Sequence, residues 1–170
     1  MTLRDVLCIS ALAQIIGIEE ADVRGSLNRL HSVILVPPSP DESPRVFHKS
    51  VADFLISRAR CDEEGFWIDA PNHEAFLVHR CLEIMEESLK ANMAMIEDPT
   101  LENGEVDGFD ERVKTTRLAP VRYACLYWVS HLAATEHMNS QIQDLLRDFL
   151  CHHLLHWMEA IVWWDRFLWR

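Results

Sequence analysis

The stretch that decides the fold runs from Val33 to Leu55 and reads VILVPPSPDESPRVFHKSVADFL. Two runs rich in β-branched residues, Val33 to Val36 and Val46 to Phe47, flank a connection that contains four prolines. Such a connection stops strands and favours turns. The stretch therefore predicts a β-hairpin with a long polar tip, followed at once by a short helix.

Two helical patterns precede this hairpin. The first consists of apolar residues at helical spacing, Ile9, Leu12, Ala13 and Ile16. Gly17 follows them, where a helix end in the left-handed conformation favours glycine. The second pattern places Val23, Leu27 and Leu30 on one face. Helix, turn, helix and hairpin in this order predict a winged helix-turn-helix domain at residues 1–60.

The rest of the chain, residues 61–170, is predicted to be a helical linker or superhelical segment, because apolar periodicity is lost between Arg58 and Asn72. A long helix is expected to begin with Asn72 as its cap, with Glu74 near the positive end of the helix dipole. Its apolar stripe comprises Leu77, Cys81, Leu82, Met85, Leu89 and Met93.

Two further helices are expected downstream. One covers residues 118–134, with Pro120 in its first turn. Its apolar face comprises Tyr123, Leu126, Tyr127 and either His131 or Leu132. The other starts near Ser140, and its inner stripe comprises Ile142, Leu145, Leu146, Phe149 and Leu150. The predicted fold class is mainly α: a winged helix-turn-helix with a small β-hairpin wing, followed by an α-helical segment.

Charge is distributed unevenly and disfavours nucleic acid as a partner. The formal net charge is −11, and residues 61–110 hold 14 acidic and 2 basic side chains. Residues 1–60 are balanced, with 7 of each sign. Duplex binding draws much of its affinity from Lys and Arg contacts to phosphates, and an acidic block repels DNA. The cations near the wing, Arg24, Arg29, Arg45 and Lys49, keep DNA binding as the alternative.

Catalytic motifs are not found in this sequence. A P-loop needs a lysine directly after its last glycine, and none of the five glycines is followed by lysine. The five cysteines are odd in number and form no CxxC pair, which is typical of reduced thiols in a cytoplasmic protein. We therefore expect a non-enzymatic protein without a cofactor of its own, located in the cytoplasm.

One cluster contains residue types that bind metal ions: Cys151, His152, His153 and His156. His152 and His156 are four residues apart and would share one helical face, as zinc ligands often do. One helix supplies too few ligands, so these two histidines are only weak candidates and no metal is expected.

The C-terminal end is rich in tryptophan, with Trp157, Trp163, Trp164 and Trp169 in the last 14 residues. The apolar run is too short, and too interrupted by Asp165 and Arg166, to span a bilayer. A dense aromatic surface favours association, so we expect this end to be covered by a partner or by a following part of a longer chain.

Six segments resemble the fungal NACHT-type signal-transducing NTPases, which are similar to NOD-like receptors of animals and plants. The segments are DVRGSLNRLHSVILV, RVFHKSVADFL, RCDEEGFWID, HRCLEIMEESLKAN, YACLYWVSHLA and FLCHHLLHWMEA, in that family's order. The resemblance is to the winged-helix and following helical region of these STAND NTPases. Neither their upstream nucleotide-binding core nor their downstream sensor repeats have a counterpart in this sequence. The chain is therefore expected to be a fragment, truncated at its C-terminus, with a truncated gene model and a decayed or free-standing copy as the alternatives.

The resemblance implies one site residue. In related receptors a winged-helix histidine reaches the phosphate of the bound nucleotide and favours the closed, ADP-bound state. His48, within Phe47-His48-Lys49, occupies the matching position. Lys49 departs from the plant pattern, in which an aspartate follows the histidine.

The implied function is that of a non-catalytic regulatory module, which helps to hold a NACHT core in its resting state. ATP or ADP would belong to the parent NTPase. The implied partners are that core, in cis or in trans, and a repeat-containing sensor or another protein at the Trp-rich end. The alternative is a free-standing winged-helix nucleic-acid-binding protein.

Overall fold

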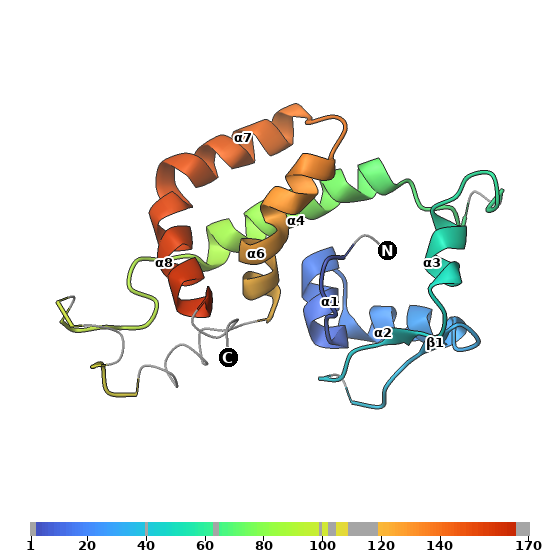
Figure 1. The fold of residues 1–170 in the computed structure, drawn as a ribbon, viewed down its shortest axis with the longest axis horizontal. Coiled ribbons are helices and arrows are strands. Elements are labelled where there is room, and N and C mark those ends of the chain that lie inside the picture. The colour runs from blue at the N-terminus through green and yellow to red at the C-terminus, as the bar shows by residue number, and fades with distance from the viewer. Residues whose placement is uncertain are drawn as a thin grey trace.

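The protein is mainly helical, with a single small hairpin among the residues that the structure describes. This computed structural model describes residues 3–39, 41–62, 65–98, 100, 101, 105–108 and 119–165, with side chains up to Val162. The hairpin and a short helix lie at one end of the molecule, and a bundle of longer helices lies at the other (Figure 1). The predicted fold class, mainly α with a small hairpin, is confirmed.

The N-terminal part begins with helix α1, Ile9–Ile16, which ends as predicted at Gly17. Gly17 has φ 73°, and its N–H donates to the carbonyl of Ala13 at 2.9 Å. One face of α1 packs with helix α2, Glu20–Arg29, through Val23. The opposite face carries Ala11 and Ile15 into the core of the helical bundle.

The hairpin follows α2 and has two short strands, β1 at Ile34–Leu35 and β2 at Arg45–Val46. They are antiparallel, with Ile34 opposite Val46 and Leu35 opposite Arg45. The Arg24 guanidinium donates to the carbonyl of Pro37 at 2.9 Å, which ties the hairpin to α2. Helix α3, Ser50–Leu55, follows directly and has no buried residue.

The helical bundle consists of α4 at Ala70–Ser88, α6 at Ala119–Ala134, α7 at Ser140–Asp148, the π-helix η1 at Phe149–His153, and α8 at Leu154–Asp165. Helix α4 packs most extensively against α6, and α7 and α8 close over them (Figure 1). Trp128, Phe149 and Trp157 form an aromatic cluster at this junction, with ring centroids 5.0 to 6.3 Å apart.

Three details of the predicted helices are wrong. Helix α4 begins at Ala70 instead of after Asn72, because Pro71 fits a first turn, where no N–H is needed, and Asp69 takes the capping position. The helix also ends at Ser88, before Met93. Finally, Leu150 is exposed, because η1 inserts a π-turn that shifts the phase of the apolar stripe.

Other predicted features are confirmed. Helix α7 begins at Ser140, as expected, and the structure adds that Asn139 caps it, because the Asn139 side-chain oxygen accepts the N–H of Ile142 at 2.8 Å. The cysteines are free thiols, and Cys61, Cys81 and Cys125 are buried. The side chains of Trp163 and Trp164, and the whole of Trp169, lie outside the described residues. Within the described part of the chain, no helix is both long and apolar enough to cross a membrane.

Candidate functional site

The predicted site residue, His48, lies in the short turn between β2 and α3, and its side chain is exposed. Its Nδ1 lies 3.1 Å from the Ser50 backbone nitrogen and 2.8 Å from the Ser50 hydroxyl. The Ser50 N–H can only donate, so Nδ1 must be the acceptor. The proton of the neutral ring is therefore on Nε2, which makes that atom a donor.

The surroundings of His48 are apolar and cationic. Residues directly opposite in a hairpin share a face, and alternate residues along a strand do too. Leu35, Arg45 and Phe47 therefore lie on one hairpin face, where Leu35 is 53% and Phe47 is 60% exposed. Lys49, next to His48, is also exposed. By the same alternation His48, one position beyond Phe47, does not share that face. Its N–H donor and the neighbouring Lys49 are both exposed and are suited to an anionic group on another protein.

The weak metal candidates are not brought together as the spacing predicted. His152 is exposed, and its Nδ1 lies 3.1 Å from the carbonyl of Asp148 in its own helix. The rings that approach each other are those of His153 and His156, at 5.7 Å between centroids. Among the side chains that the structure describes, no three His, Cys, Asp or Glu residues are grouped to hold a metal ion.

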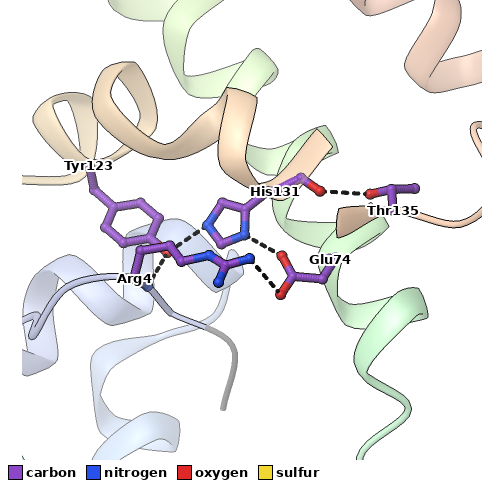
Figure 2. Close-up of polar contacts among 5 residues, drawn as sticks. All are labelled: Arg4, Glu74, Tyr123, His131 and Thr135. Atoms are coloured by element: carbon purple, nitrogen blue, oxygen red, sulfur yellow. Dashed lines mark hydrogen bonds and ion pairs between the residues drawn. The ribbon is translucent and has the colours of Figure 1, made fainter. Parts of the chain in front are cut away.

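A second site was not predicted: a ring of hydrogen bonds in the bundle core, made by Arg4, Glu74, Tyr123 and His131 (Figure 2). The His131 side chain is fully buried and Glu74 is 5% exposed. Glu74 therefore does not act as an exposed charge at the start of α4, as the sequence suggested. It faces inward and pairs with both Arg4 and His131.

The direction of each hydrogen bond in this ring follows from which groups can donate and which can only accept. The Arg4 backbone N–H donates to the Tyr123 hydroxyl at 3.2 Å, and the Tyr123 hydroxyl lies 2.7 Å from His131 Nε2. His131 Nδ1 lies 2.5 Å from Glu74 Oε2, and the Arg4 guanidinium donates to Glu74 Oε1 at 3.3 Å. With a neutral His131 protonated on Nδ1, the Tyr123 O–H donates to Nε2 and every buried donor has an acceptor.

The pKa values agree with a neutral histidine. Burial lowers the pKa of His131, and this effect outweighs the opposing influence of Glu74, whose charge is shared with Arg4. Burial also raises the pKa of the Tyr123 hydroxyl, so this group stays protonated. The ring is therefore a structural polar network at neutral pH, without an ionisable nucleophile.

The two buried cysteines of the bundle are not reactive groups. Burial raises the pKa of the Cys81 thiol to about 12, and it raises that of Cys125 further. A thiol with so high a pKa carries almost no thiolate at neutral pH. Cys125 is therefore a small core residue, as the sequence indicated.

Helix α1 is also held at its C-terminal end by α4. The Arg80 guanidinium donates to the carbonyl of Ile15 at 3.0 Å and to that of Gln14 at 3.1 Å, and it pairs with Glu83. These are last-turn carbonyls without a partner inside the helix, and a cation satisfies them well.

An open apolar pocket of about 280 Å³ lies between α1 and α4, lined by Leu3, Leu12, Ile16, Ile68, His73, Phe76 and Leu77.

One sequence signal could have found the buried ring. Tyr123 and His131 are eight residues apart on one helix, which places two polar side chains on its inner face. Their partners, Glu74 and Arg4, lie 57 and 119 residues away from His131 and Tyr123 in the chain. No local pattern indicates those pairings.

Comparison with known proteins gives one informative similarity. The chain is 28% identical over 133 residues to the vegetative incompatibility protein HET-E-1 of Podospora anserina. The alignment covers 67% of this chain and 9% of that protein, so the chain spans less than a tenth of this relative's length. No family model matches the sequence, and no solved structure matches the chain.

Proposed function

We propose that this chain is a non-catalytic regulatory and interaction module of a fungal NACHT-type signalling NTPase. In this proposal residues 1–60 form a winged-helix domain whose hairpin and α3 face the nucleotide-binding core. His48 then donates from Nε2 to a nucleotide phosphate oxygen and favours the closed, ADP-bound state. The chain itself needs no cofactor, since ATP or ADP binds to the core.

The observation that carries the proposal is the fixed orientation of His48. The Ser50 N–H occupies Nδ1, and Nε2 is left as a donor on an exposed surface. A preorganised N–H donor beside cations is suited to a phosphate oxygen. Lys49, next to His48, adds positive charge, while Arg45 and the exposed Leu35 and Phe47 on the adjoining hairpin face supply further area for contact with a protein.

Two further observations support this assignment. The similarity to a fungal incompatibility protein agrees with the six segments that resemble fungal NACHT proteins. Helix α3 has no buried residue, although Phe54 is apolar and 40% exposed, so this surface is suited to burial against another domain. Because a resting state persists only through differential contacts, the module must contact the ADP-bound core better than the ATP-bound core.

The test uses a chain in which a NACHT core is joined in cis upstream of this module. His48→Asn keeps an acceptor near the Nδ1 position for the Ser50 N–H but removes the outer donor. His48→Gln places an amide N–H near the Nε2 position. We expect faster ADP release in His48→Asn and a rate closer to the unmodified chain in His48→Gln. Equal ADP release in both variants and the unmodified chain would eliminate the role of His48.

The alternative, binding of duplex DNA, is less favoured by the contacts of the second helix. Arg24 is engaged with Pro37 in the hairpin, which leaves fewer free cations on the second helix. Migration of duplex DNA at low salt provides the test, with Arg29→Ala as the variant. Retardation that disappears in Arg29→Ala would favour the alternative over the NACHT module.

A further inference from the structure

The residues that lead into α1 are held against the bundle at adjacent positions. Arg4 joins the buried ring, and Asp5 pairs with Arg122 at 3.3 Å. Leu7 is buried in the bundle core, whereas Val6, between them, is 68% exposed. Residues 3–8 therefore form an irregular segment that is tied down by side chains instead of by secondary structure. We name residues 3–8 the strap.

The strap is fastened by a closed set of interactions. Arg4 contributes its backbone N–H to Tyr123 and its guanidinium to Glu74, and His131 connects these two partners (Figure 2). Loss of any member leaves at least one buried polar group without its partner, which destabilises more than the loss of an exposed hydrogen bond. The four groups are therefore expected to hold or to release the strap together.

The strap differs from the rest of this interface in what holds it in place. The Arg4 side chain is 40% exposed, and the strap lacks the backbone ladder of a helix or strand. In contrast, η1 and α8 are joined to α6 by the aromatic cluster of Trp128, Phe149 and Trp157, and α7 packs against α4. Segments without regular backbone hydrogen bonds and with partly exposed anchors open locally at lower free energy than the packed helices of the core.

We propose that the strap is a conformational latch, in which the ring of Arg4, Tyr123, His131 and Glu74 locks the start of α1 onto α4 and α6. When Arg4 withdraws, the strap and the first turn of α1 leave the bundle, while α7 and α8 stay folded. Leu3 lines the apolar pocket between α1 and α4, so the open latch also widens that pocket. The latch is independent of any nucleotide and of His48.

Hydrogen exchange followed by mass spectrometry tests the latch on the full chain. Tyr123→Phe removes the hydroxyl that joins Arg4 to His131 with little change in volume. We expect amides in residues 4–12 to exchange at least tenfold faster, while those in α7 keep their rates. Tyr127→Phe is the matched control, because it removes a hydroxyl from the same helix outside the ring, and it should change neither region.

A second variant keeps the test decisive if Tyr123→Phe does not fold. Arg4→Met removes the guanidinium from Glu74 but retains an apolar stem, and the same local acceleration is expected. In the double variant the acceleration should be smaller than the product of the two single effects, because both break one ring. Three results would overturn the latch. Exchange could accelerate equally in α7 and in residues 4–12, or it could stay unchanged in residues 4–12. The third is an acceleration in the double variant that equals the product of the two single accelerations.

Discussion

Gly17 gives the sharpest test of how the first helix ends. Its φ of 73° lies in the left-handed region, which costs a residue with a side chain about 1–2 kcal/mol. A Cβ at this position would lie 3.4 Å from Arg80 Cζ, an ordinary contact distance, so the strain comes from the backbone and not from a clash. We therefore expect Gly17→Ala to lower the free energy of unfolding by about 1 kcal/mol or more.

Gly25 provides a matched control of opposite sign. It lies inside α2, and an added Cβ would have no neighbour within 4 Å. Gly25→Ala should therefore raise the free energy of unfolding by about 0.5–1 kcal/mol, through helix propensity alone. Gly17→Asn should be milder than Gly17→Ala, because asparagine tolerates the left-handed conformation better.

Urea denaturation of the three variants and the unmodified chain measures these changes. If the m-value is unchanged, a shift of the midpoint reports stability directly. For a chain of this size 1 kcal/mol corresponds to about 2–4 °C in the thermal midpoint, which gives an independent check. A neutral or stabilising Gly17→Ala would refute the left-handed end of α1, and a destabilising Gly25→Ala would refute the open environment of Gly25.

Three further predictions concern the bundle. Burial lowers the pKa of His131 in the folded state, so on acidification this histidine is protonated in the unfolded state before it is protonated in the folded state. The free energy of unfolding should therefore fall as the pH decreases from about 6.5, the unfolded pKa, towards the lowered folded pKa. His131→Gln should reduce that slope in pH-dependent urea denaturation, and an unchanged slope would contradict it. Arg80→Ala should lower the free energy of unfolding by about 1–2 kcal/mol in thermal denaturation, because two α1 carbonyls lose their hydrogen-bond donor. An unchanged stability would show that water replaces the Arg80 guanidinium as the donor. Trp157→Phe should lower the free energy of unfolding by about 1 kcal/mol, because the indole N–H no longer donates to the Cys125 carbonyl. Trp157→Ala should lower it by an amount on the order of 3 kcal/mol, because the buried ring is also lost. Equal losses of the two variants in urea denaturation would contradict this ranking.

The features predicted from the sequence are those set by neighbouring residues. The glycine end of α1, the hairpin around its proline-rich connection and the start of α7 near Ser140 all depend on residues that are close in the sequence. Local backbone preference and hydrogen bonding are sufficient to specify them.

The features that escaped prediction depend on distant contacts or on a change of helical phase. Glu74 looked like a surface charge in the first turns of a helix, and only the approach of α6 and Arg4 makes it a buried partner. Leu150 fitted the apolar stripe of an α-helix, but the π-turn at η1 rotates it to the surface. Such an insertion has no signature in apolar spacing alone.

The central claim is that this chain recognises a NACHT core in its resting state. Its most direct test measures the affinity of the purified chain for a separately produced core, loaded either with ADP or with a non-hydrolysable ATP analogue. We expect tighter binding to the ADP-loaded core by at least about fivefold, which is the lower end of the usual coupling between linked sites. Equal affinity for the two forms, or no binding to either, would contradict it.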